Sequence, residues 1–504
     1  MNGGRSDPPT SPEENDHAGT SKWLNELGNC VYSEIDMNER TDANQAVSKH
    51  TALAVASISS FAVPFMSSSI NVALPDIGRV FNLNAVVLGW VATIFLLAAA
   101  IFLLPFGKIA DIVGRKKIYL YGVISFTAFT AVSALAPNIT FLLIARTLQG
   151  AGAALIFGTG VAILTSVFPP SERGKALGMN VAFTYTGLSL GPVLGGVLTQ
   201  RFGWTSVFWV IVPLGVVATI LVLWKLKGEW KEAAGEHLDI VGSLVAGSAL
   251  AVLIYGLSVL PSIAGYTFVF AGIAGIIGFI AWERRARDPV VRLDMFVGNR
   301  VFAMSNVAAL INYSATFAIT FFMSLYLQYI KGMDPGQAGL VLIAQPAMMA
   351  IFSPITGRLS DRYQARVLAS IGMGMMAVML FLLSRISPDT PLWFLVPSLL
   401  ILGIGYALFS SPNANAIMGS VERKVYGVAS AMMSIMRLMG QMMSMAIALL
   451  IVSVHIGNAK IVPGNYPELL GSLRTAFVVF AVLSAAGVFA SLARGRVVHA
   501  SPHE

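Results

Sequence analysis

Two arginines, Arg146 and Arg437, lie in the middle of long apolar stretches of the sequence. A guanidinium stays charged at physiological pH and can bind a carboxylate or phosphate through two parallel hydrogen bonds. None of the 25 Asp and Glu residues lies in the middle of such a stretch. If both arginines face one cavity, that cavity is electropositive and suits an anionic or neutral compound better than a cation.

Uncharged polar residues also lie within the apolar stretches. In an apolar surrounding, such a side chain more often bonds a neighbouring helix than a ligand. Asp76, just beyond the first apolar stretch, is the acid nearest to the expected cavity and the candidate proton carrier. The other candidates for contact with a small molecule are Asn71, Gln149, Tyr185, Asn312, Gln345 and Asn413.

The residues that most enzymes need are missing from the apolar stretches. Cys30 is the only cysteine, which excludes an internal disulfide, a thiolate metal cluster and a CxxC redox pair. The six histidines lie in tails, in loops or at the ends of apolar stretches, and the sequence has neither an HExxH motif nor a Ser/His/Asp set. We therefore expect no enzymatic activity, no metal and no cofactor. A receptor that signals through a cytoplasmic tail is the alternative from another class.

The elements that must position these residues are membrane-spanning helices. Only 12% of the 504 residues are charged and 56% are hydrophobic, whereas soluble proteins are about 25% charged. Each apolar stretch is long enough to cross a hydrocarbon core of about 30 Å as a helix. There are fourteen of them, near 51–74, 86–106, 118–137, 139–168, 176–199, 205–226, 240–260, 264–282, 301–329, 337–357, 367–386, 392–417, 426–454 and 472–493.

Basic residues orient these helices. Residues 1–49 form a polar, proline-rich segment with nine acids and four bases, which we expect to be a disordered cytoplasmic tail. With this tail inside, the inner loops carry 21 Lys and Arg residues and the outer loops carry six. This bias follows the positive-inside rule and predicts a multi-pass protein of the cell membrane with both termini in the cytoplasm. It also accounts for the net charge of +8 without a nucleic-acid partner.

Part of the sequence repeats at an offset of 250 residues. The segment 107–111, Gly-Lys-Ile-Ala-Asp, matches 357–361, Gly-Arg-Leu-Ser-Asp, and Glu172-Arg173 matches Glu422-Arg423. Shifted by the same 250 residues, the first apolar stretch also overlaps the ninth. The repeat therefore indicates a duplication of six helices. We therefore predict an N-terminal half at 50–226, two inserted helices with flanking loops at 227–299, a C-terminal half at 300–493 and a cytoplasmic tail at 494–504.

The segment 107–117 resembles the signature loop of the major facilitator superfamily, and 357–361 resembles a second copy of it. In that family the loop is a cytoplasmic latch that breaks when the carrier opens inward. We expect Gly107 to permit close approach of two helices, and Asp111 to cap the incoming helix while attracting Arg115. The resemblance implies a gating role for Gly107, Asp111, Arg115, Gly357, Asp361 and Arg362.

Two further segments agree with this family. The segment 146–152, Arg-Thr-Leu-Gln-Gly-Ala-Gly, resembles its second motif, in which the arginine is implicated in proton coupling. In the segment 187–196, glycines recur at every fourth position and a proline kinks the helix. This segment resembles the motif that marks exporters, which implies a gating role for Gly187, Gly191, Pro192, Gly195 and Gly196.

The segments 71–77, 239–242 and 326–328 are similar to those of the fourteen-helix drug:proton antiporter subfamily. The resemblance implies an all-α polytopic membrane protein with the major facilitator fold, built from two six-helix halves and two inserted central helices. It also implies a monomeric multidrug efflux transporter that works by alternating access in the lipid bilayer. Such a transporter exchanges its small-molecule substrate for protons.

One position departs from that subfamily. Met66 stands where its members have an Asp in the first helix. Without that carboxylate, the usual carrier of cations and protons is missing. The alternative is therefore an exporter of an anionic or neutral metabolite, with recognition through arginine and an atypical coupling to protons.

Overall fold

The computed structural model describes residues 3–4, 49–231, 238–286, 294–360, 362–421, 426–457 and 459–495. Within these ranges, 14 helices are long and apolar enough to cross a membrane. The prediction of an all-α chain with fourteen membrane helices is confirmed. Most of both predicted tails, Asp361 and the pair Glu422-Arg423 lie outside the described residues.

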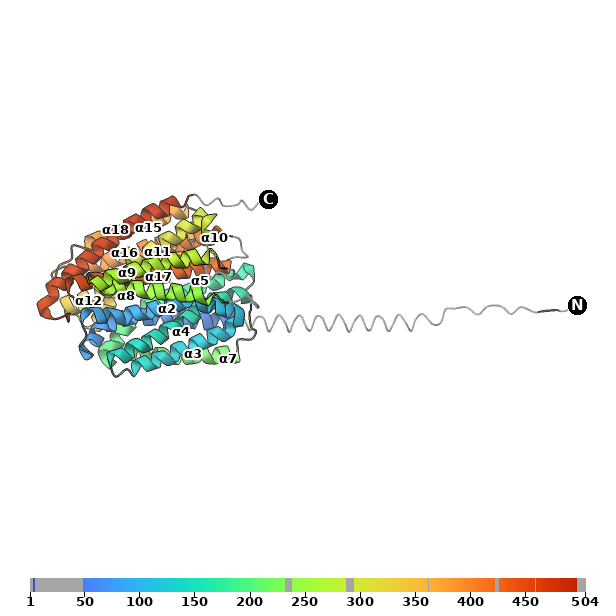
Figure 1. Cartoon of the computed structure of the whole chain (residues 1–504), viewed down its shortest axis with the longest axis horizontal. Helices are drawn as coiled ribbons and strands as arrows, with labels where there is room; N and C mark the ends of the chain where they lie inside the picture. The colour runs from blue at the N-terminus through green and yellow to red at the C-terminus, as the bar shows by residue number, and fades with distance from the viewer. Residues whose placement is uncertain are drawn as a thin grey trace. The chain divides into compact units, whose positions relative to one another are not determined.

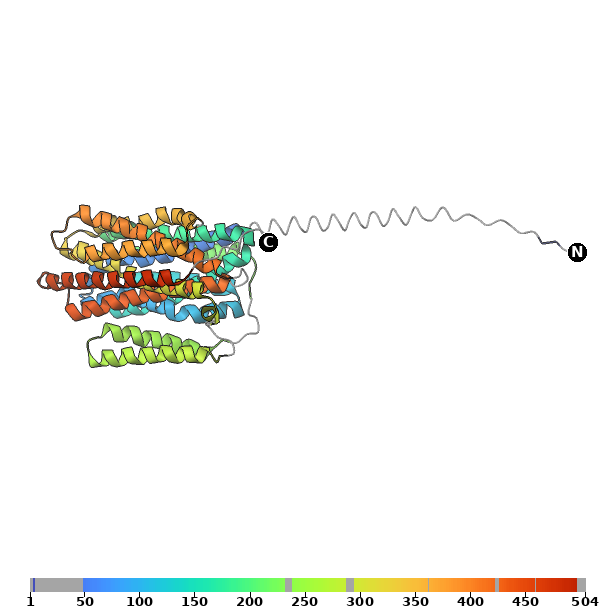
Figure 2. The same cartoon turned by 90° about the horizontal axis from the view of Figure 1, so that it is seen from above.

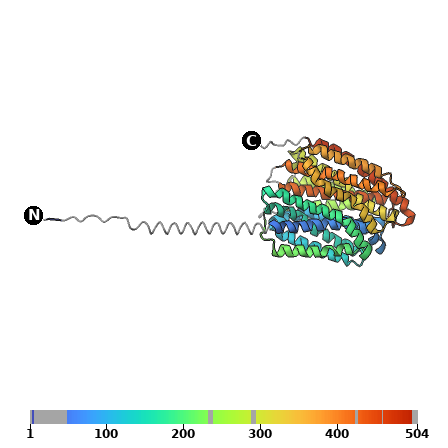
Figure 3. The same ribbon diagram turned by 180° about the vertical axis from the view of Figure 1, so that it is seen from behind.

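The first six membrane helices gather on one side of the bundle and the last six on the other (Figure 1). The first six are an initial helix at Lys49–Val80, α2 (Ala85–Val113), α3 (Arg115–Ala134), α4 (Ile139–Val167), α5 (Pro170–Phe202) and α6–α7 (Ser206–Trp209, Ile211–Trp224). The last six follow the short helix α10 (Asp294–Val297) and are α11–α12–η1 (Arg300–Thr316, Ala318–Leu325, Tyr326–Ile330), α13–α14 (Pro335–Leu342, Ala344–Ser360), α15 (Ala365–Leu383), α16 (Leu392–Gly419), α17 (Tyr426–His455) and η3–α18 (Pro463–Asn465, Tyr466–Ala493). Seen from behind, the two groups keep this division (Figure 3).

Helix lengths agree with the duplication. Shifted by 250 residues, the initial helix would cover 299–330, and the ninth membrane helix covers Arg300–Ile330. Several helices begin at a side chain that accepts a hydrogen bond from the first turn. Asn84 and Asn138 do so for α2 and α4, and Asp334 does so for α13. Such caps pair backbone N–H groups that a membrane would leave unpaired.

Consecutive membrane helices run in opposite directions, which defines two ends of the bundle. We call the end that holds the turn at Gly114, between α2 and α3, the signature-loop end. The opposite end holds the turn between the initial helix and α2, and also Pro335 at the start of α13. We call it the far end.

The inserted pair, α8 (Ile240–Ser258) and α9 (Ile263–Glu283), stands at one edge of the bundle (Figure 2). It touches one helix of each half, because Gly247 packs on Ile101 of α2 and Ser453 of α17 donates a hydrogen bond to the carbonyl of Leu260. Large apolar side chains of α9, such as Phe270 at 78% exposure, point away from the bundle. This face is suited to lipid.

Two membrane helices of the C-terminal half are interrupted. The ninth breaks at Phe317, where the backbone N–H of Ala318 donates to the hydroxyl of Ser444. The tenth breaks at Ile343, between α13 and α14. Irregular backbone at membrane depth is tolerated where it is buried in protein or lines a cavity. Phe317 lies on the wall of the cavity described next.

Candidate functional site

A cavity lies between the first six and the last six helices. Its larger part, the Arg437 chamber, encloses about 1140 Å³ including the space open to solvent, between the initial helix, α2, α4 and α5 on one side and α11, α16 and α17 on the other. A smaller part, the Gln345 chamber, extends toward the far end along α12, α13 and α14. The chambers adjoin, because both are lined by Ser67, Leu188, Tyr313, Phe317, Tyr406 and Gln441.

Arg437 supplies the charge of this cavity. Its half-buried side chain lines the Arg437 chamber, and its guanidinium carbon lies 5.7 Å from the ring centroid of Phe157 on α4. It forms no hydrogen bond or ion pair with any residue that the structure describes. The residues that line the two chambers include no Asp or Glu. The guanidinium is therefore available to an anion in the cavity.

Aromatic side chains form much of the wall around Arg437. The rings of Tyr313 and Tyr406 meet edge to face, with centroids 5.8 Å apart. The hydroxyl of Tyr185 lies 2.9 Å from that of Ser410, which joins α5 to α16 across the two halves. Tyr406 is not among the predicted residues, although it is a phenol within an apolar stretch, the same signal that marked Tyr185.

Neutral polar groups line the Gln345 chamber. The amides of Gln345 and Gln441 face this space, and no hydrogen bond of either is recorded among the described residues. The amide nitrogen of Asn71 donates to the carbonyl of Ser67, whereas its buried Oδ1 has no partner within the described chain. This chamber therefore offers donors and acceptors without a net charge.

Arg146 lies behind the cavity wall rather than on it. It is fully buried, its Nε donates to the carbonyl of Val91 at 3.2 Å, and its Nη1 donates to Gln149 at 2.7 Å. Gln149 in turn donates to Thr130 at 2.6 Å. The ring of Phe95, which lines the Arg437 chamber, lies 4.5 Å from the Arg146 guanidinium. Of the two predicted arginines, the structure thus brings only Arg437 to the cavity.

A third arginine supports the wall from the other half. Arg494 is 1% exposed, and its Nη1 donates to Asn413 at 2.9 Å and to Ser305 at 3.3 Å. Asn413 lines the Arg437 chamber, and its amide nitrogen donates to the carbonyl of Ser305. Burial lowers the pKa of Arg494 to about 10, so it stays charged at neutral pH. Sequence analysis assigns Arg494 to a tail, because it follows the last apolar stretch by one residue.

Two predicted residues lie away from the cavity. Asn312 is fully buried in α11, lines neither chamber, and has no partner for either amide atom among the residues described. Asp76 lies at the far end, where its carboxylate is 4.0 Å from Arg79. It does not line the cavity.

The far end of the cavity is closed by main-chain contacts between the halves. A side chain on Gly196 of α5 would collide with the carbonyl of Pro335 on α13, and one on Gly339 would collide with the carbonyl of Pro192. Ser324 and Gln328 donate hydrogen bonds of 2.7 and 2.9 Å to backbone carbonyls of the initial helix. The other predicted glycines of α5 act within the first half. Gly187, Gly191 and Gly195 pack one face of α5 directly on the initial helix.

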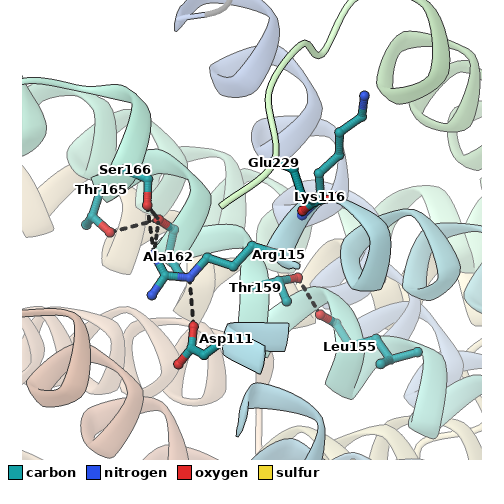
Figure 4. A network of polar contacts seen from close by, with 9 residues as sticks. All are labelled: Asp111, Arg115, Lys116, Leu155, Thr159, Ala162, Thr165, Ser166 and Glu229. Atoms are coloured by element: carbon teal, nitrogen blue, oxygen red, sulfur yellow. Dashed lines mark hydrogen bonds and ion pairs between the residues drawn. The ribbon is translucent and has the colours of Figure 1, made fainter. Parts of the chain in front are cut away.

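The signature loop holds together at the other end (Figure 4). The Nε of Arg115 donates to the carboxylate of Asp111 at 2.8 Å, and its Nη1 donates to Ser166 at the end of α4 at 2.7 Å. The prediction that Asp111 caps the incoming helix is wrong, because Asp111 belongs to the last turn of α2 and Gly114 occupies the cap position of α3. The carboxylate at the start of α3 is that of Glu229, which accepts from the backbone N–H of Lys116 at 2.9 Å. Glu229 is 113 residues away in sequence, so local spacing gives no signal for it.

The remaining gating candidates are placed as follows. The prediction that Gly107 permits the close approach of two helices is wrong, because a Cβ on Gly107 would meet no atom within 4 Å outside its own helix. Gly158 of α4 is the glycine at this contact, since a Cβ there would lie 3.3 Å from the Cα of Gly107. A Cβ on Gly357 would lie 3.9 Å from Ser411 of α16, an ordinary contact. Arg362 is exposed, and its neighbour Asp361 lies outside the described residues.

Comparison with known proteins gives consistent matches. The sequence model of the Major Facilitator Superfamily matches residues 56–297 and 306–503. The chain is similar to the cephamycin export protein CmcT of Amycolatopsis lactamdurans, with 30% identity over 473 residues that cover 90% of this chain and 95% of the relative. It is also similar to the multidrug resistance protein Stp of Mycobacterium tuberculosis, with 32% identity over 387 residues, 75% of this chain and 71% of the relative. A solved bacterial homologue of the human lysosomal transporter Spinster shares the fold, with a TM-score of 0.61 and 18% identity over 89% of this chain and 97% of that chain.

Proposed function

Since the chain belongs to the Major Facilitator Superfamily, we propose that it exports small organic compounds across the cell membrane by alternating access. Names of relatives support export, because two of them are an export protein for cephamycin and a multidrug resistance protein. The glycine face of α5 supports it further, since the corresponding motif marks exporters and packs directly on the initial helix.

The observation that carries this proposal is a cavity between the two halves whose far end is closed by backbone contacts. At the far end, α5 and α13 meet backbone to backbone at Gly196 and Gly339. On the other side, Val181, the lining residue of α5 nearest to the signature-loop end, is 47% exposed. The excess of basic residues on the same side favours a cytoplasmic location of the signature-loop end. A compound from the cytoplasm would enter once the signature-loop end opens, with the pair of Asp111 and Arg115 broken, and would leave after the far end opens.

Proton antiport is the energy source that we propose for this cycle. Asp76 is the candidate proton carrier, because it lies at the far end of the initial helix and has Arg79 as its neighbour at 4.0 Å. Its distance from the cavity means that a proton and a substrate would not share one site. They would instead be coupled through the closure of the far end, to which the initial helix contributes.

A second candidate is export of an anionic or neutral metabolite. It is favoured by Arg437, which lines the cavity and has no partner in the described part of the chain. A lipophilic cation would meet this charge without a carboxylate to offset it.

Transport in everted membrane vesicles tests the proposal, because their outer surface is the cytoplasmic face of the cell membrane. Vesicles with the full chain should accumulate at least one fluorescent compound from a panel of anions, cations and neutral molecules, whereas vesicles without it should not. Nigericin, which collapses the pH gradient, should abolish the accumulation. Accumulation in right-side-out vesicles alone would assign uptake instead of export.

A further inference from the structure

We propose that the substrate is a small planar aromatic anion held at two points, with its anionic group on Arg437 and a neutral polar group at its other edge in the Gln345 chamber. The inference rests on the proposed function and names the substrate class of that cavity. It is argued from the charge, the spacing and the wall chemistry of the cavity.

The charge of the region selects an anion. Arg437 lies on the cavity wall, Arg146 lies behind Phe95, and Arg494 lies behind Asn413. None of the three is paired with a carboxylate that the structure describes. These three guanidinium groups are all positively charged, so together they produce a positive potential in the cavity. The low dielectric constant of the surrounding protein strengthens this potential. Only Arg437 can reach the cavity, so the anionic group of the ligand belongs there.

The spacing sets the size of the ligand. Arg437 and Gln441 are four residues apart on α17, so they share a helix face and are separated by about 6 Å along the axis. Gln441 lines both chambers and lies nearer to the far end. A ligand that contacts both Arg437 and Gln441 therefore needs a body that spans about 6 Å, close to the length of two fused six-membered rings.

The walls between these points favour a flat, aromatic body. Tyr313, Phe317 and Tyr406 line both chambers and so flank the path from one to the other. Aromatic rings bind planar ligands through stacked and edge-to-face contacts. The Arg437 guanidinium lies over the ring of Phe157, which lines the same chamber.

The far edge of the ligand must be polar but uncharged. Gln345 and Gln441 each bring an amide with a donor and an acceptor. Among the residues that the structure describes, no Lys, Arg, Asp or Glu lines this chamber. A hydroxyl, an amide or an imide would pair with these groups, whereas a second charge would be buried without a partner.

Three naphthalene compounds separate these features, and their fluorescence reports binding to the purified full chain. 6-Hydroxy-2-naphthoate has both polar groups, 2-naphthoate lacks the hydroxyl, and 6-hydroxy-2-naphthamide lacks the charge. We expect 6-hydroxy-2-naphthoate to bind at least tenfold more tightly than the amide, as expected for a charge-assisted hydrogen bond. We expect it to bind several-fold more tightly than 2-naphthoate.

Substitutions assign each preference to its chamber. Arg437→Gln should remove the preference for the naphthoate over the amide, and Arg437→Lys should keep a reduced preference. Gln345→Leu combined with Gln441→Leu should remove only the preference for the hydroxyl. Arg385→Gln is the matched control, because Arg385 also lies over a phenylalanine, 5.4 Å from Phe381, but lies outside both chambers.

Equal binding of the naphthoate and the amide by the wild type, or an unchanged preference in Arg437→Gln, would overturn the inference. This outcome is distinct from failure of the proposed function. Vesicles that export a cation without any preference for the naphthoate would retain the exporter and reject the aromatic anion. A preference of the purified chain for the naphthoate over the amide, without export in vesicles, would retain the aromatic anion as the ligand and reject the proposed export.

Discussion

Replacing Gly196 by alanine puts a methyl group where α5 meets α13 at the closed far end. The added Cβ would lie 3.0 Å from the carbonyl carbon of Pro335 and 3.2 Å from the Cα of Gly336, and would collide with the Pro335 oxygen. These neighbours are backbone atoms, which cannot rotate away. The two helices can accept the methyl group only by moving apart.

The size of the effect follows from the cost of overpacking a close contact, about 1–3 kcal/mol. The strain exists only while the far end is closed, so the whole cost falls on that state. The ratio of closed to open molecules should therefore fall by a factor of about 5 to 150. Gly196→Val, with two further methyl groups, should shift it more.

The assay uses spin labels on two exposed far-end positions, Val80 on the initial helix and Trp393 at the start of α16. Cys30 is the only native cysteine, so Cys30→Ser gives a clean background for Val80→Cys and Trp393→Cys. We expect Gly196→Ala to populate longer distances and to slow export at least fivefold. Gly374→Ala is the control, because no atom lies within 4 Å of the added Cβ. Distances and export rates in both Gly196 variants that match those of Gly374→Ala would refute the reasoning.

Three other substitutions follow from the same contacts. Arg146→Ala should abolish export while surface expression is retained, since it unpairs Gln149 and removes the cation beneath Phe95, and normal efflux would contradict this. Glu229→Ala should destabilise the chain by about 1 kcal/mol through loss of a helix cap, seen as a lower melting temperature in detergent, with Glu229→Gln falling between it and the wild type. Asn312→Leu should raise the melting temperature and leave naphthoate binding unchanged, because it removes two buried amide atoms that have no partner in the described part of the chain. A loss of naphthoate binding would instead show that Asn312 belongs to the binding site.

Sequence predicts the helices well for a physical reason. Within a membrane, the backbone N–H and C=O groups of each spanning segment must bond to one another, because lipid offers no partners. A long apolar stretch is therefore helical. The common face of the glycines at 187, 191 and 195 can also be predicted from the sequence, since every fourth residue lies on one face of a helix. The structure packs that face on the initial helix.

The direction in which a buried polar side chain points is much harder to predict. Arg146 and Arg437 both lie in apolar stretches with polar neighbours, yet one is sealed behind Phe95 and the other lines the cavity. The difference depends on which helices pack around each one, and a membrane helix has no polar face to reveal it. Glu229 and Arg494 are missed for a related reason, because their partners are distant in sequence.

The contacts that close the far end and those that hold the signature loop are of different kinds. Far-end closure relies on backbone contacts at Gly196 and Gly339 and on hydrogen bonds to carbonyls, all of which act only at contact distance. The signature loop relies on an ion pair within the first half, in which Arg115 is 8% and Asp111 36% exposed at a separation of 2.8 Å. Salt screens such a partly buried pair only weakly, and a steric contact is indifferent to salt. Ionic strength should therefore have little effect on either set of contacts, whereas Arg115→Gln should loosen the signature loop alone.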